Sequence, residues 1–154
     1  MNPLTEIAEI QIVYTPVTNW DKQPTICSSE GAYNVFRDLF EKNTIHLQEQ
    51  FVVLYLGNDN KLKAAYRHST GSLTGSLADV RLILGTALKL ASVGILIAHN
   101  HPSGNMKPSK QDEIITLKIY EAAKLLDLKL LDHLIISPRD GQYLSFVDEG
   151  ILEP

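Results

Sequence analysis

The chain has 154 residues, 44% of them hydrophobic, and is long enough to form one compact domain with its own core. Its formal net charge of −4, without any densely basic segment, argues against direct binding to nucleic acid, which needs positive charge for the phosphates. Because the N-terminus lacks a leader-like apolar run, Cys27 has no disulfide partner, and no stretch is apolar enough to cross a bilayer, we expect a cytoplasmic protein without membrane contact.

The first half of the chain predicts a strand, a helix and a hairpin. Alternating apolar residues indicate a strand over residues 6–14, and a proline-containing loop follows it. The serine pair at 28–29 caps a predicted helix that ends near Asn43. A buried strand is predicted over residues 50–56, and residues 61–69 return beside it as the second strand of a hairpin.

The second half alternates helices and strands. After a glycine-containing loop over residues 71–76, Asp79 caps a helix, and the apolar run 93–98 is typical of a central strand that is buried on both faces. A helix opened by Ser109 and ending near Asp127 then precedes two more strands, over residues 128–137 and 142–147.

This order of elements predicts a single α/β domain built on a mixed, mostly antiparallel sheet flanked by helices. No internal repeat or linker interrupts it. We assign residues 28–154 to this domain and residues 1–27 to an N-terminal extension made of one strand and a loop.

The most informative segment follows the predicted central strand and reads His99-Asn100-His101-Pro102. Side chains two residues apart in extended backbone point to the same side, so His99 and His101 share one side and Asn100 points away. Pro102 ends the strand. Imidazole and carboxylate suit Zn²⁺, and a site with three protein ligands keeps a position for water, whereas closed structural sites normally use cysteine.

Asp112 completes this ligand set. The apolar positions of its helix form one stripe: Ile115, Ile119, Ala122 and Leu126. Asp112 lies three residues before Ile115 and so faces inward, where a charge is costly unless something neutralises it. Taken alone, Ser109 with Asp112 is more simply a capping box, and the histidines are more simply surface or core imidazoles. The complete pattern, however, arises by chance at roughly one in 10⁷ start positions, which favours a metal site.

His99-x-His101-Pro102, followed by Ser109-x-x-Asp112, resembles the signature of JAMM/MPN metallopeptidases. With the segment Leu131-Asp132-His133-Leu134, the chain is similar to the bacterial RadC-like branch over roughly residues 28–150. The resemblance implies a JAMM/MPN fold, a three-layer sandwich like that of cytidine deaminases. It also implies one zinc ion held by His99, His101 and Asp112, with water as the fourth ligand.

The same resemblance implies catalytic roles for Glu49 and Ser109. Glu49, just before the strand 50–56, would act as general base, although its local sequence alone favours a solvated charge at a strand start. Ser109 would donate to the oxyanion of the substrate, a contact typically worth about 3 kcal/mol of barrier. The implied activity is that of a zinc metalloprotease that hydrolyses an amide or isopeptide bond in an unidentified peptide or protein substrate.

Two features depart from the family pattern. Full-length RadC-like proteins carry a helix-hairpin-helix DNA-binding region, and the segment before residue 28 is too short for one, which weakens the DNA-repair role that the family name suggests. The family's Pro-Arg-Glu element is replaced by Asp79-Val80-Arg81-Leu82. The alternative function is a metal-binding scaffold or accessory protein in DNA repair or a mobile element. The presence of both Glu49 and Ser109 argues against it, since a scaffold needs neither.

The remaining histidines and aromatic residues are given structural roles. Asp132 and His133 are neighbours on a predicted strand and point to opposite faces, so at most one reaches the site, and we expect His133 to play a supporting role there. His46 and His68 have no partner at ligand spacing, and we predict both at the surface. Three aromatic residues are predicted to serve in packing: Trp20, Tyr143 and Phe146.

Overall fold

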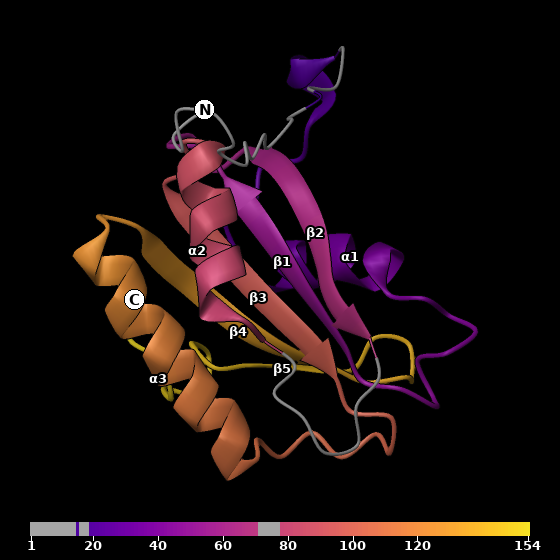
Figure 1. The fold of residues 1–154 in the computed structure, drawn as a ribbon. Helices are drawn as coiled ribbons and strands as arrows, with labels where there is room; N and C mark the ends of the chain where they lie inside the picture. Colours follow the sequence, from indigo (N-terminus) through magenta and orange to yellow (C-terminus); the bar gives the residue numbers. More distant parts are fainter. Residues whose placement is uncertain (1–14, 16–18, 71–77) are drawn as a thin grey trace, which may run out of the picture.

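A five-stranded sheet with the order β2-β1-β3-β4-β5 forms the middle layer of the protein (Figure 1). Its strands are β1 (Gln50–Leu56), β2 (Leu62–Thr70), β3 (Gly94–Asn100), β4 (Lys129–Ile136) and β5 (Tyr143–Ser145). Every neighbouring pair is antiparallel except β3 and β4, which are parallel. The predicted mixed, mostly antiparallel sheet is therefore confirmed. The computed structural model describes residues 15, 19–70 and 78–154, so the predicted strand 6–14 and loop 71–76 lie outside the described residues.

Helices cover both faces of this sheet and complete three layers. They are α1 (Ser29–Leu39), α2 (Val80–Lys89) and α3 (Lys110–Leu125), with a short 3-10 helix η1 (Trp20–Lys22) before them. Alternate residues of β1 explain the layers: Phe51, Val53 and Tyr55 pack with α2 and α3, whereas Val52, Leu54 and Leu56 pack with α1. Figure 1 shows α2 and α3 on one face and α1 on the other. Among the described helices, none is both long and apolar enough to span a membrane.

Helix starts follow the predicted caps, but the end of α1 does not follow the prediction. The Ser28 hydroxyl accepts the Gly31 N–H at 3.0 Å, and the Asp79 carboxylate accepts the Arg81 N–H at 2.9 Å. α1 stops at Leu39 rather than near Asn43. Beyond the helix end the Glu41 N–H donates to Gln50 Oε1 at 2.9 Å, a side-chain partner in place of the carbonyl four residues earlier that a longer helix would use.

Two structural assignments from the sequence were wrong. Trp20 is 37% exposed rather than packed, and none of the residues of η1 is buried. His68 is half-buried rather than at the surface, and its Nε2 accepts the Asp79 N–H at 2.6 Å where the chain enters α2. His46 is exposed, as predicted. The packing roles of Tyr143 and Phe146 are confirmed by a ring stacked on Tyr33 at 4.6 Å and by complete burial, respectively.

Candidate metal centre

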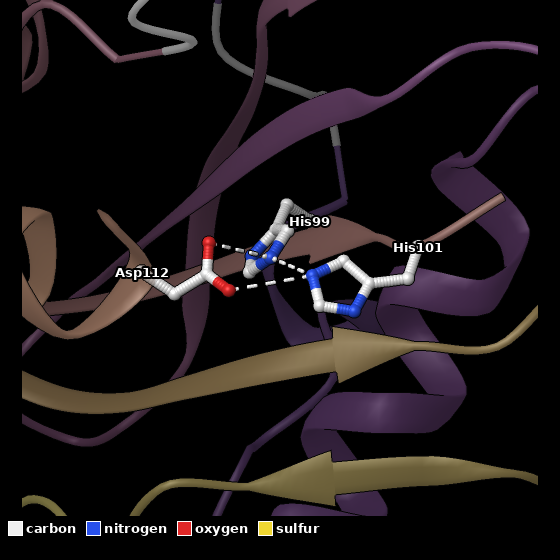
Figure 2. A group of neighbouring side chains, drawn as sticks. All are labelled: His99, His101 and Asp112. Atoms are coloured by element: carbon white, nitrogen blue, oxygen red, sulfur yellow. Dashed lines mark hydrogen bonds and ion pairs between the residues drawn. The ribbon is translucent and has the colours of Figure 1, made fainter. Parts of the chain in front are cut away.

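Three side chains converge where the central strand ends and α3 begins (Figure 2). His99 Nε2 lies 2.9 Å from His101 Nε2 and 3.1 Å from Asp112 Oδ1, and His101 Nε2 lies 3.3 Å from Asp112 Oδ2. Among the described residues, this is the single cluster of three side chains with ligand atoms close enough to share a metal ion. The structure thus brings together all three predicted ligands.

His101 is oriented by the loop that follows it. Its Nδ1 lies 2.6 Å from the backbone oxygen of Asn105, and since a carbonyl can only accept, this nitrogen carries the hydrogen. The loop bends back at Gly104, whose φ of 78° favours glycine and whose N–H donates to the His101 carbonyl at 2.9 Å. An uncharged His101 ring therefore presents the lone pair of Nε2 to the cluster.

His99 is held from behind by His133. The His99 Nδ1 lies 2.7 Å from His133 Nε2, so its own Nε2 faces Asp112 and His101. His133 is completely buried and stacks on Phe146 with ring centroids 4.5 Å apart. Burial holds the pKa of His133 well below its usual value, and the nearby His99 lowers it further.

Asp132 points to the other face of β4. Its carboxylate accepts the Ser145 hydroxyl at 2.6 Å and the Val147 N–H at 3.1 Å, which ties down the chain after β5. The prediction that only one residue of the Asp132-His133 pair reaches the site is therefore confirmed, and the one that reaches it is His133.

Asp112 combines the two interpretations that its sequence allowed. The Ser109 N–H donates to Asp112 Oδ2 at 2.6 Å and the Asp112 N–H donates to Ser109 Oγ at 3.1 Å, which is a capping box. The same carboxylate faces both histidines. The cap therefore holds in place the carboxylate that completes the cluster.

The inward face of α3 differs from the predicted stripe. Thr116, Ile119 and Ala123 are its buried residues, and Ile115 and Ala122 are only partly buried. Leu126 is 40% exposed, because the helix ends at Leu125 and the chain turns toward β4 through Asp127, whose φ is 55°.

The charges of the cluster act on one another. Burial raises the pKa of Asp112, but the close contacts of its carboxylate with His101 and His99 outweigh this effect and hold the pKa far below its usual range. Burial lowers the pKa of His101, but contacts with Asp112 and the Asn105 carbonyl, together with the charge of Glu49, raise it overall. The cluster thus favours positive charge at its centre.

This arrangement fits a divalent cation. With both rings uncharged, two imidazole lone pairs and a carboxylate are aimed at one another over distances of 2.9 to 3.3 Å. Such groups repel unless a positive charge lies among them, and a metal ion or a proton can supply that charge. Two imidazoles and one carboxylate form the kind of donor set that suits Zn²⁺.

Glu49 and Ser109 lie at the edge of the cluster. Glu49 is half-buried immediately before β1, near enough for its charge to contribute to the raised pKa of His101. Ser109 is exposed at the start of α3, and its hydroxyl oxygen accepts the Asp112 N–H. Since a hydroxyl also carries a donor, Ser109 keeps an O–H that it can offer to another group.

Sequence reasoning missed the part that Asn100 plays. This residue is completely buried, and its Oδ1 accepts the Gln50 N–H at 2.6 Å. Its Nδ2 donates to the carbonyls of Ile45 and Gln48 at 2.8 and 2.9 Å. Asn100 therefore fastens the segment that carries Glu49 to the strand that carries His99. The available signal was an amide at the end of an apolar strand, because a polar side chain buried there must find partners.

Comparisons with known proteins agree with this geometry. The family model for the RadC-like JAB domain matches residues 26–151. A UPF0758 protein of Porphyromonas gingivalis is 45% identical over 137 residues, which are 89% of this chain and 59% of that protein. A UPF0758 protein of Flavobacterium johnsoniae is 41% identical over 130 residues, 84% of this chain and 55% of that protein.

A third relative covers a similar share of the chain. A UPF0758 protein of Methanosarcina acetivorans is 36% identical over 127 residues, 82% of this chain and 53% of that protein. The chain thus spans somewhat more than half the length of these curated relatives. On the match of the family model and these identities, the chain belongs to the family of RadC-like JAB domains.

Proposed function

We propose that this protein is a zinc-dependent hydrolase that cleaves an amide or isopeptide bond in a peptide or protein. The observation that carries the proposal is the convergence of His99, His101 and Asp112, whose hydrogen bonds to the rest of the protein leave their ligand atoms aimed at one point. Three protein ligands with no cysteine are the pattern of catalytic rather than structural zinc sites.

His99, His101 and Asp112 would hold the metal, which when bound lowers the pKa of a coordinated water to about 7. Glu49 would accept a proton from the attacking water and then pass it to the leaving amine. Its half-buried position before β1, held by Asn100 through the neighbouring Gln50 and Gln48, suits that role.

Ser109 would act on the carbonyl oxygen of the substrate. Its hydroxyl oxygen is occupied as an acceptor by the Asp112 N–H, so its hydrogen is the part available to a developing negative charge. The loss of such a donor typically costs a factor of about 100 to 1000 in rate.

The test uses the wild type with Glu49→Gln and His99→Ala, and Glu121→Gln as the matched control because Glu121 is exposed on α3. Zinc is counted by elemental analysis, and cleavage is measured on a fluorogenic peptide library and an isopeptide-linked ubiquitin dimer. We expect Glu49→Gln to keep zinc and lose turnover by about 100-fold or more, because general-base catalysis contributes at least that much. We expect His99→Ala to lose zinc and Glu121→Gln to match the wild type.

Three outcomes would contradict parts of the proposal. Full turnover by Glu49→Gln would remove Glu49 from the role of base. A wild type that binds no zinc in metal-rich buffer would contradict the metal centre. Stoichiometric zinc without cleavage of any probe would favour the metal-binding scaffold.

A further inference from the structure

A line of hydrogen bonds leads from His99 away from the metal centre into the core. His99 Nδ1 lies 2.7 Å from His133 Nε2, and His133 Nδ1 lies 2.6 Å from the Thr116 hydroxyl. The Thr116 hydroxyl in turn lies 2.5 Å from the backbone oxygen of Asp112, one turn earlier in α3. Neither His133 nor Thr116 is a member of the ligand cluster.

The last hydrogen bond of this line, between Thr116 and the Asp112 carbonyl, fixes which atom donates in each of the others. The Asp112 carbonyl can only accept, and an oxygen–oxygen distance of 2.5 Å requires a hydrogen between the two atoms. The single hydrogen of the Thr116 hydroxyl is therefore directed at that carbonyl. Thr116 Oγ1 can then serve His133 only as an acceptor, so His133 carries its hydrogen on Nδ1.

The hydrogen position on His133 in turn fixes the one on His99. His133 is completely buried against Phe146, which favours the uncharged ring with a single N–H. With that hydrogen on Nδ1, the Nε2 of His133 is an acceptor, and the hydrogen shared with His99 belongs to His99 Nδ1. The Nε2 of His99 is then left with a lone pair facing Asp112 and His101.

We infer that His133 and Thr116 are positioning residues that hold His99 in the tautomer that can bind a metal, with its hydrogen on Nδ1. The inference rests on the proposed metal centre and adds to it the residues that prepare one ligand. Because the line ends on the backbone of Asp112, it also ties the first turn of α3 to the end of β3, and so connects two ligands through the core.

The Thr116 hydroxyl opposes a competing arrangement. If every hydrogen in the line were reversed, His99 would carry its hydrogen on Nε2, only 3.1 Å from Asp112 Oδ1. That contact is favourable in the metal-free protein, yet it removes the lone pair that a metal needs. The reversed line would require a donor at Thr116, whose hydrogen is already held by the Asp112 carbonyl.

The matched variants are Thr116→Val, which keeps the shape of the side chain without its hydroxyl, and Thr116→Ser, which keeps the hydroxyl. Zinc affinity is measured on the full chain by competition with a chromophoric chelator. We expect Thr116→Val to bind zinc about tenfold to 100-fold more weakly, the usual effect of losing a residue that orients a ligand. We expect Thr116→Ser to restore the affinity to within about threefold of the wild type.

The tautomers are measured directly by long-range ¹H–¹⁵N NMR of the histidine rings in the metal-free protein. In the wild type we expect the hydrogen on Nδ1 of both His99 and His133, and in Thr116→Val we expect it on Nε2 of His99. A merely structural role of Thr116 would leave the tautomer of His99 unchanged.

Two results would overturn the inference: a wild-type His99 with its hydrogen on Nε2, or a folded Thr116→Val that binds zinc as tightly as the wild type. If Thr116→Val does not fold, the wild-type spectrum still decides. A wild type that binds no zinc contradicts the proposed function, whereas wild-type binding that Thr116→Val leaves unchanged contradicts only this inference.

Discussion

Replacing Asn100 by leucine should loosen the segment that carries Glu49 while leaving the metal ligands in place. Leucine has the same branched arrangement of heavy atoms as asparagine, with bulkier ends, but can make none of its hydrogen bonds. The bonds lost are those to the Gln50 N–H and to the carbonyls of Ile45 and Gln48. His99 and His101 point away from this cluster of contacts, so we expect zinc to remain bound.

The size of the effect follows from the burial of each partner. The Gln50 N–H is buried and would be left without an acceptor, which costs about 1–3 kcal/mol. The two carbonyls are only partly buried and can turn to water, so each contributes about 0.5 kcal/mol. A total of about 3 kcal/mol in the free energy of unfolding would lower the Tm of a domain of this size by roughly 6–12 °C.

Urea denaturation, amide hydrogen exchange and zinc analysis test this prediction. We expect Asn100→Leu to unfold at lower urea, to lose exchange protection over residues 41–49, and to keep its zinc. The control is Asn34→Leu on the exposed face of α1, which should change stability by no more than about 0.5 kcal/mol. Unchanged protection over residues 41–49, or loss of zinc from an otherwise stable variant, would refute the reasoning.

Three further predictions concern caps and pH. Ser109→Ala should lower the free energy of unfolding by about 1 kcal/mol, and Ser109→Gly by only a few tenths, because glycine is a tolerable N-cap. Urea denaturation measures this difference, and both variants should lose turnover equally if the hydroxyl serves the substrate. Zinc affinity should fall about tenfold per pH unit below the pKa of His101, since the proton competes with the metal. Because that pKa is raised, the fall should begin above pH 6.5. Chelator competition between pH 5 and 8 measures it, and a fall that begins only below pH 6.5 would contradict the prediction. The Arg81 side chain lowers the pKa of Asp79 from 3.8 to about 2, so the stability that Asp79 contributes is present above pH 3.8 and lost as the pH falls toward 2; acid denaturation of Asp79→Ala should lack this part of the wild-type slope.

Side-chain alternation in strands and residue preferences at helix ends predicted the placement of the metal ligands. The alternation of side chains along a strand put His99 and His101 on one side, and the capping preferences of serine and aspartate located the starts of α1, α2 and α3. Helical spacing placed Asp112 on the inward face of its helix, and the two histidines upstream made it a candidate ligand. Each placement uses residues within one or two turns of one another, where backbone geometry limits the choices.

Tertiary structure decided which contacts support the site. His133 meets His99 only because β3 and β4 run parallel in a register that pairs Ile97 with His133 and His99 with Ile135. Asn100 reaches the residues before β1 because β1 and β3 are antiparallel neighbours. The spacing of apolar residues within a segment does not predict which other segment it pairs with, and these partners lie 34 and 50 residues apart. The ligands were therefore set by local spacing, whereas the residues that orient them depend on strand register, which follows from the packing of the whole sheet between its helices.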